Sequence, residues 1–184
     1  MYTENEIIDG CIKKNRNMQK ILYDKYASKF YAICLRYVYN KAEADDILQD
    51  GFLKIFTNIG QFSRDHSLEG WMRRVMVNTA ITHYKKNQKH YYQKELEDIN
   101  ETDIENFNVL DAEFTQDELL QTIQKLAEGY KMIFNLYAIE GYKHKEIAEM
   151  LNIDEATSKS QFHRARKIIQ ENLTKLAKTR TIQE

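Results

Sequence analysis

The stretch HKEIAEMLNIDEATSKSQFHRARK, residues 144–167, contains two helical patterns separated by a short interruption. In the first pattern Ile147, Ala148 and Leu151 fall on one face, as expected for an amphipathic helix. The interruption contains Asn152, a residue type that tolerates a left-handed backbone conformation. A second amphipathic pattern begins a few residues later. The stretch therefore predicts two helices that meet at a steep angle, a helix-turn-helix.

The second helix of this stretch has two different faces. One side is an apolar stripe predicted to be buried, formed by Phe162, Ala165, Ile169, Leu173 and Leu176. The other side carries short or forked hydrogen-bonding side chains, the types that read base edges in the major groove, namely Thr157, Ser160, Gln161 and Arg164. Six basic residues against one acid lie between Lys159 and Lys178. This pattern indicates DNA binding, and the alternative is a helix pair with an ordinary solvated face.

The composition of the 184-residue chain is typical of a water-soluble helical protein. Hydrophobic residues make up 42% and charged residues 30%, and no run approaches the roughly 18 consecutive apolar residues of a membrane span. Proline is absent and there are six glycines, so the turn dipeptides that punctuate β-sheet proteins are missing. We therefore expect an all-α fold without membrane insertion. The N-terminus does not look like a secretion signal, which predicts a cytoplasmic location.

The residue types that most often act in catalysis or bind metal ions are not arranged here in any spacing typical of those functions. Cys11 and Cys34 fit no zinc or redox spacing and are predicted to be small buried hydrophobic residues. The five histidines are scattered, and no Ser/His/Asp or metal-binding constellation emerges. We therefore expect no catalytic residues, no metal, no cofactor and no enzymatic activity.

Four helices are predicted before residue 93. Three of their starts are marked by capping residues, which are Thr3 with Glu6, Asn40 with Glu43, and Ser67. A long core helix over residues 18–39 is indicated by apolar residues at steps of three and four. These helices are predicted to form a first domain, residues 1–92.

An acidic segment follows, although the net charge of the whole chain is only −1. Residues 93–122 contain ten acids and one base, and the part before residue 111 has little apolar periodicity. We interpret residues 93–114 as a linker. Thr115 with Glu118 then caps a helix expected to end near Gly129, and a further helix leads to Gly141. Together with the helix-turn-helix they are predicted to form a second domain, residues 115–184.

Two features of the first domain suggest partners. Asp46, Gln49, Asp50 and Leu53 share the face opposite an apolar stripe, a polar surface suited to a cationic partner. In HYKKNQKHYYQK, residues 83–94, lysines alternate with tyrosines, a combination used to bind single-stranded nucleic acid. A solvated face and a basic helix end are the plainer explanations of the two patterns.

On these residues the sequence resembles the extracytoplasmic-function branch of bacterial RNA polymerase sigma factors. The resemblance covers AEADDILQDGFLKIF at residues 42–56, LEGWMRRVMVNTAITHYKK at residues 68–86, and the segment 129–166 that includes the helix-turn-helix. Both domains match in the family's order. The chain differs from the family at four positions. His83 stands where an acid is frequent, and Ala127 where proline is frequent. Ala156 replaces a common glycine, and Ser158 a common valine.

The resemblance implies three sets of contact residues. The set at or near the clamp helices of the polymerase β′ subunit is Asp46, Gln49, Asp50, Phe52 and Lys54. The set around a base flipped from the melted minus-ten strand is Phe62, Ser63, Arg64, Trp71, Arg74, Asn78, His83 and Lys85. The set that contacts the minus-thirty-five element is Lys159, Ser160, Gln161, His163, Arg164 and Arg166.

The resemblance further implies a promoter-specificity factor that works on core RNA polymerase. Its expected partners are the β′ clamp helices, the β flap, double-stranded and melted promoter DNA, and an anti-sigma factor. The alternatives are a helix-turn-helix regulator that acts without delivering polymerase, and a helical adaptor that binds only proteins. The combination of the Asp46 helix with the Trp71 segment favours the sigma factor.

Overall fold

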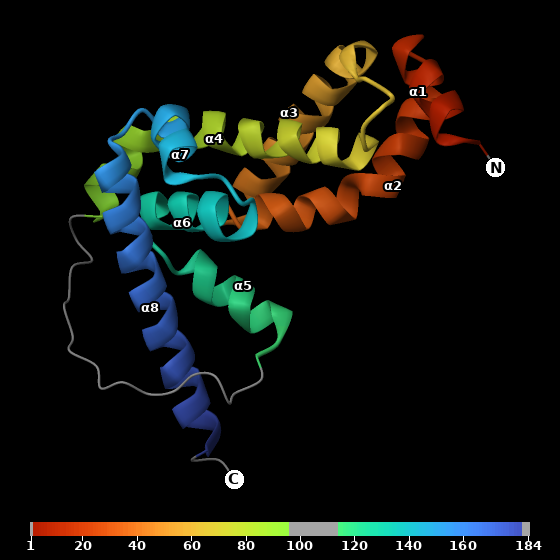
Figure 1. Cartoon of the computed structure of the whole chain (residues 1–184). Helices are drawn as coiled ribbons and strands as arrows, with labels where there is room; N and C mark the ends of the chain where they lie inside the picture. Colours follow the sequence, from red (N-terminus) through yellow and green to blue (C-terminus); the bar gives the residue numbers. More distant parts are fainter. Residues whose placement is uncertain (1, 96–113, 182–184) are drawn as a thin grey trace. The chain divides into compact units, whose positions relative to one another are not determined.

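The computed structural model describes residues 2–95 and 114–181 (Figure 1). Within these ranges every regular element is helical, which confirms the predicted all-α fold. The chain divides into two compact units, Met1–His83 and Tyr84–Glu184. Each unit contains the helices that carry one part of the expected function.

The first unit is built on a packed helix pair. Its elements are α1 (Glu4–Ile12), α2 (Arg16–Leu35), α3 (Lys41–Asn58), the 3₁₀ turn η1 (Ile59–Gln61) and the first part of α4 (Leu68–Glu95). α2 packs along α3, and α1 packs against both α2 and η1. Phe30, Ile55 and Met72 are fully buried and represent the core of this unit. Their burial removes large apolar surfaces from water, which is the main stabilising contribution to such a unit.

The helix starts of the first unit follow the capping residues. Thr3 forms a complete capping box with Glu6. The Asn40 side chain accepts a hydrogen bond from the Glu43 amide at 2.9 Å, and the Ser67 hydroxyl accepts one from the Gly70 amide at 3.2 Å. These bonds satisfy amide groups that the helix itself leaves unpaired, so the predicted starts are confirmed.

α2 differs from its predicted range of 18–39. It begins after Asn15, whose side-chain oxygen accepts hydrogen bonds from the amides of Asn17 and Met18 at 2.9 and 3.3 Å. It ends at Leu35, which leaves five residues to turn the chain before α3 begins at Lys41. The prediction began at the first apolar residue of the pattern and therefore missed this polar cap.

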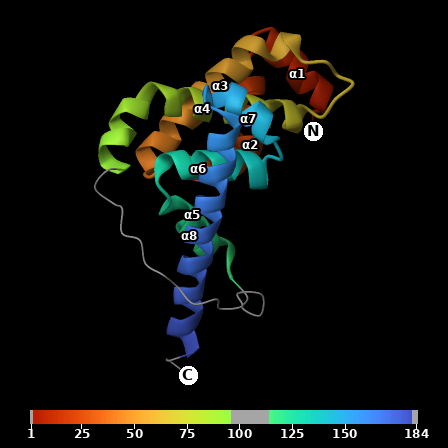
Figure 2. The ribbon, with the colours of Figure 1, turned by 60° about the vertical axis from the view of Figure 1, so that its left-hand side comes forward.

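The second unit contains the end of α4 and four further α-helices. They are α5 (Gln116–Gln124), α6 (Glu128–Phe134), α7 (His144–Leu151) and α8 (Glu155–Thr181), and a π-helical segment, η3 (Asn135–Ile139), continues α6. α5, α6 and α7 all pack against α8, the long helix that Figure 2 shows beside them. α8 is therefore the scaffold of this unit.

The connection between α5 and α6 corrects the prediction that α5 ends near Gly129. α5 ends at Gln124, and Gly129 lies inside α6. Ala127 is extended, with φ −54° and ψ 148°, and starts α6 without a side-chain cap. The start of α5 was predicted correctly, because Thr115 and Glu118 form a complete capping box.

The helix-turn-helix is confirmed in α7 and α8. Asn152 adopts the left-handed conformation expected of it, with φ 57° and ψ 51°. The amide of Ile153 then donates to the carbonyl of Ala148 at 3.1 Å, which closes the turn. Ile147 of α7 and Ala165 of α8 are fully buried, so the two helices hold together through small and branched apolar side chains.

The predicted domain limits fall partly outside the described residues. Residue 92, the predicted end of the first domain, lies within α4, and most of the predicted linker 93–114 lies in the range 96–113 that the structure does not describe. The limits stay predictions. No helix in the described part of the chain is long and apolar enough to cross a membrane.

Both cysteines are buried free thiols, as predicted. Cys11 is 0% and Cys34 1% exposed. Burial raises the pKa of Cys11 to about 11 and the pKa of Cys34 to about 12. The uncharged thiol is thus strongly favoured, and thiolate chemistry is suppressed at neutral pH. Among the described side chains no group of three or more His, Cys, Asp and Glu is placed to hold a metal ion.

Candidate functional site

The outer face of α3 combines acids with an exposed apolar side chain. Asp46, Gln49 and Asp50 are exposed, and Leu53 on the same face is 64% exposed. The opposite face buries Ile47 and other apolar residues in the core. The core of this unit is built by the opposite face of α3, so the exposed Leu53 side chain is not part of that core. This outer face of α3, hereafter the α3 face, is a candidate protein interface.

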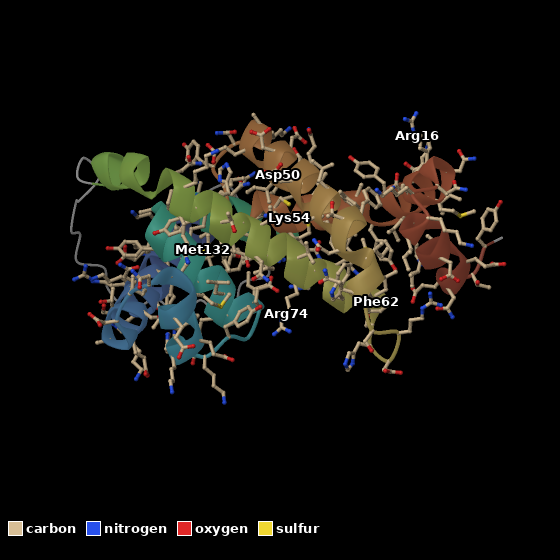
Figure 3. The ribbon with its side chains drawn as sticks, turned by 90° about the horizontal axis from the view of Figure 1, so that it is seen from above. Arg16, Asp50, Lys54, Phe62, Arg74 and Met132 are labelled. Atoms are coloured by element: carbon tan, nitrogen blue, oxygen red, sulfur yellow. The ribbon has the colours of Figure 1, made fainter. Side chains whose placement is uncertain are left out.

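One of the residues predicted for this interface, Lys54, is held by a neighbouring helix. The Lys54 amine donates to the Thr79 hydroxyl of α4 at 3.2 Å, while its side chain remains exposed. Figure 3 shows Asp50 and Lys54 on adjacent turns of α3. The hydrogen bond ties the α3 face to α4 and limits the positions that the Lys54 charge can take.

Phe52, which is expected at or near the contact surface, lies in the core behind it. It is 3% exposed, and its ring centroid lies 4.6 Å from that of Tyr23 and 6.1 Å from that of Phe30. Phe52 is thus part of the aromatic core behind α3. It supports the α3 face and presents no surface to a partner.

The loop between η1 and α4, residues 62–67, has an aromatic pair where it joins the helices: Phe62 begins the loop and Trp71 lies in the first turn of α4. The ring centroids of Phe62 and Trp71 lie 5.7 Å apart, and both side chains are partly exposed. Ser63 and Arg64 are exposed, and the Ser63 hydroxyl donates to Asp65 at 3.0 Å. The loop therefore offers ring surface and hydrogen-bonding groups at the same place.

α4 extends this candidate site with polar residues. Arg74 is exposed, and its side chain projects from α4 on the side toward which the loop after Phe62 also extends (Figure 3). Asn78 and Lys85 are exposed, and His83 is partly exposed. The predicted single-strand-binding pattern continues with lysines and tyrosines in residues 88–94. The structure does not describe the side chains of these residues.

The start of α8 presents the predicted DNA-reading face. Its exposed members are Lys159, Ser160, His163, Arg164 and Arg166, and Gln161 is partly exposed. Ser158 and Ala165 on the other side are fully buried. The Lys159 amine pairs with Glu155 at 2.6 Å, and the Ser160 hydroxyl donates to the Thr157 carbonyl at 3.0 Å. The outward direction of this set, hereafter the α8 face, therefore agrees with the sequence pattern.

A polar contact inside the helix-turn-helix was not predicted from the sequence. His144, the first residue of α7, has its ring Nδ1 2.9 Å from the hydroxyl of the buried Ser158 on α8. The imidazole also stacks on Tyr137, with ring centroids 4.1 Å apart. The pKa of His144 is lowered by burial, and Lys159 acts in the same direction. The replacement of a common valine by Ser158 was the signal in the sequence that could have found this contact.

Comparison with known proteins links these surfaces to one family. The family model for sigma-70 region 2 matches residues 22–90, and the model for sigma-70 region 4 matches residues 116–169. The ECF RNA polymerase sigma factor SigW of Bacillus subtilis is 30% identical over 165 residues, which are 84% of this chain and 88% of that protein. The chain belongs to the extracytoplasmic-function sigma factors.

Other comparisons agree with this family. The ECF RNA polymerase sigma-E factor of Haemophilus influenzae is 25% identical over 95% of this chain and 97% of its own length. The solved structure of the sigma factor RpoE of Bartonella quintana, in complex with the anti-sigma factor NepR, has a TM-score of 0.50 at 17% identity, covers 84% of this chain and 96% of its own, and shows the same fold.

The two family matches divide the candidate residues between them. The region 2 match contains the α3 face, the loop 62–67 and the described side chains of α4, and the region 4 match contains the α8 face. As a sigma factor the chain directs promoter-specific transcription initiation by RNA polymerase.

Proposed function

We propose that three surfaces divide the work of initiation in this sigma factor, and that the α3 face binds core RNA polymerase. The observation that carries this assignment is Leu53, which is 64% exposed among Asp46, Gln49 and Asp50. An apolar centre with a polar rim is the usual composition of a protein interface. The acids suit a basic surface on the β′ clamp helices, since complementary charge speeds and orients association.

The loop 62–67 and the adjacent part of α4 form the second surface, which holds the melted minus-ten strand. A base that leaves the stack loses a few kcal/mol of stacking and pairing, so it needs a pocket and an aromatic surface. Phe62 and Trp71 supply aromatic surface where the loop meets α4. Ser63, Asn78 and partly exposed His83 supply hydrogen-bonding groups. Arg74 and Lys85 supply positive charge for the backbone phosphates.

The α8 face forms the third surface, which reads the minus-thirty-five element in the major groove. Arg164 and Gln161 have forked side chains that can make two hydrogen bonds to a base edge: the guanidinium of Arg164 donates both, and the amide of Gln161 donates one and accepts one. Lys159 and Arg166 flank them at positions suited to phosphates. The left-handed turn at Asn152 sets the angle at which α8 enters the groove.

These assignments give the chain the division predicted from its sequence. Residues 1–92 act on polymerase and the minus-ten element, residues 93–114 link the domains, and residues 115–184 act on the minus-thirty-five element and the β flap. The two family matches, at 22–90 and 116–169, support this division. The chain acts in the cytoplasm with polymerase and DNA, and it lends binding energy to initiation without catalysing a reaction of its own. An anti-sigma factor that covers these surfaces is the expected regulator.

A separation-of-function experiment tests the three assignments. Leu53→Ala, Phe62→Ala and Arg164→Ala are each measured for affinity to core polymerase, to a single-stranded minus-ten oligonucleotide and to a duplex minus-thirty-five element, the two DNA assays with holoenzyme. Each variant is expected to weaken one interaction by about tenfold and to leave the other two within about twofold. A variant that weakens all three equally, or none, removes the assignment of its surface.

A further inference from the structure

The loop 62–67 is connected to α1, an element that none of the assignments above uses. The guanidinium of Arg64 in the loop is paired with the carboxylate of Asp9 on α1. The two residues are 55 positions apart in the sequence. α1 also packs against η1, the short helix that leads into the loop. α1 therefore lies beside the short helix that precedes the loop, and Asp9 reaches into the loop itself.

α1 provides a fixed platform for this contact. Ile8 and Cys11, on either side of Asp9 in the sequence, are 2% and 0% exposed. The Thr3 capping box holds the first turn of the helix. Gly10 lies so close to Met18 of α2 that a Cβ there would be 2.3 Å from the Met18 Cγ. The backbone of Asp9 is thus held by its neighbours, while its side chain is 52% exposed and reaches the loop.

The loop itself is anchored in the core at its two flanks. Ile59 before it and Leu68 after it are each 1% exposed. Between these anchors Ser63 to Ser67 are exposed. Ser67 accepts hydrogen bonds from the Gly70 and Trp71 amides of α4. The described bonds of Ser63 to His66, apart from that of Arg64, run within the loop, from Ser63 to Asp65 and from the His66 amide to the Ser63 carbonyl at 3.3 Å. A bond from Arg64 to a fixed helix therefore restricts the part of the loop with the greatest freedom.

We propose that Asp9 is a positioning residue for the minus-ten pocket: it holds Arg64 and so sets the shape of the loop that receives the flipped base. This inference rests on the proposed function of the loop. A guanidinium has five N–H donors, so Arg64 can keep its bond to Asp9 and still donate to a phosphate or base. The opposite role, in which Asp9 competes with DNA for Arg64, predicts tighter binding when Asp9 is removed.

The expected size of the effect follows from the exposure of the pair. The Arg64 and Asp9 side chains are 45% and 52% exposed, so water screens the attraction between their charges. The pair therefore contributes only modestly to the free energy that holds the loop in place. Loss of the pair should therefore reduce base discrimination about two- to fivefold, without abolishing it.

Holoenzyme assembled from the full chain and core polymerase provides the test. Its affinity is measured for minus-ten single strands that are intact or carry one abasic position in turn, and the ratio of the two affinities reports base capture. Asp9→Ala is the test variant, and Glu4→Ala, which removes an exposed acid from the same helix, is the matched control. Asp9→Glu, which keeps the carboxylate, is the conservative variant, and Arg64 is left unchanged because it belongs to the set expected to contact DNA.

The inference predicts that Asp9→Ala lowers the discrimination ratio about two- to fivefold, that Glu4→Ala leaves it unchanged, and that Asp9→Glu keeps most of the wild-type ratio. A ratio that Asp9→Ala leaves unchanged or raises overturns the inference, as does an Asp9→Glu variant that loses as much discrimination as Asp9→Ala. If wild-type holoenzyme itself binds every abasic strand as well as the intact one, the base pocket is the assignment that fails, and the role of Asp9 fails with it.

Discussion

His144 and Ser158 are hydrogen-bonded across the helix-turn-helix, with the imidazole Nδ1 2.9 Å from the serine hydroxyl. Ser158 is fully buried and lies one residue before Lys159 of the α8 face. The bond therefore joins the first turn of α7 to the part of α8 assigned to DNA. Its strength affects both the stability of the unit and the orientation of the α8 face.

This contact predicts a pH dependence of stability. The pKa of His144 lies below its ordinary value of 6.5, chiefly because burial disfavours the imidazolium and also because Lys159 repels it, while Glu155 opposes the shift. The unfolded chain thus takes up this proton at a higher pH than the folded chain does. The stability contribution is complete above about pH 6.5 and is lost as the pH falls through the lowered pKa.

Thermal unfolding at about pH 7.5 and about pH 5.5 checks this prediction. The melting temperature of the wild type is expected to fall more between the higher and the lower pH than that of His144→Gln, which cannot take up the proton. Equal losses in the two proteins would show that His144 does not contribute to the acid sensitivity.

Two glycine substitutions are expected to change stability in opposite directions. A Cβ at Gly10 would lie 2.7 Å from the Cβ of Met18, an atom that cannot move without the backbone of α2. Gly10→Ala should therefore push α1 away from α2 and lower the free energy of unfolding by about 1–3 kcal/mol. At Gly70 the nearest atom, the Ser67 Cβ, is 3.6 Å away. Gly70→Ala should therefore raise the free energy of unfolding by about 0.5 kcal/mol, because alanine favours the helix.

Chemical denaturation of both variants measures this difference. Because alanine has the higher helix propensity at both positions, only the close approach at Gly10 can reverse the sign. A stabilised Gly10→Ala variant would mean that α1 does not pack against α2 as closely as described.

Asp50→Lys is expected to remove polymerase binding while the fold remains intact. Asp50 is exposed on the α3 face, so the substitution changes no buried contact, and the free energy of unfolding should stay within about 0.5 kcal/mol of wild type. A lysine facing a basic partner surface adds repulsion where there was attraction, and affinity for core polymerase should fall at least about tenfold.

Titration of fluorescently labelled protein with core polymerase measures the effect. Asp65→Lys is the matched control, because it makes the same charge change at an exposed residue of the loop 62–67, outside the α3 face. If Asp50→Lys and Asp65→Lys bound core polymerase equally well, the α3 face would lose its assignment.

Local chemistry explains why most of the fold could be predicted from the sequence. The caps at Thr3, Asn40 and Thr115 act on amides within three residues of themselves, so their signal is contained in a few letters. The left-handed turn at Asn152 is equally local. The end of α5 was missed because Leu126 continues the apolar spacing across the break, and periodicity carries no sign of the extended residue that follows.

The candidate site was predictable only as far as faces of single helices. The outward direction of the α3 and α8 faces follows from helical periodicity and is confirmed by their exposure. Phe52 was assigned from the family resemblance, which does not separate a contact residue from the core residue behind it. The Asp9–Arg64 and His144–Ser158 pairs join separate elements, so they depend on tertiary packing that no local pattern contains.

Run-off transcription with core polymerase tests the central claim, that this chain confers promoter specificity through the α3 and α8 faces. A library of promoter templates is transcribed by core polymerase alone, with the wild-type protein, and with Asp50→Lys or Arg164→Ala. With the wild type, we expect specific transcripts from a subset of promoters. With Asp50→Lys we expect none. With Arg164→Ala we expect fewer transcripts from promoters that depend on the minus-thirty-five element. Transcripts that do not depend on the added protein, or that both variants support as well as the wild type, would contradict the claim.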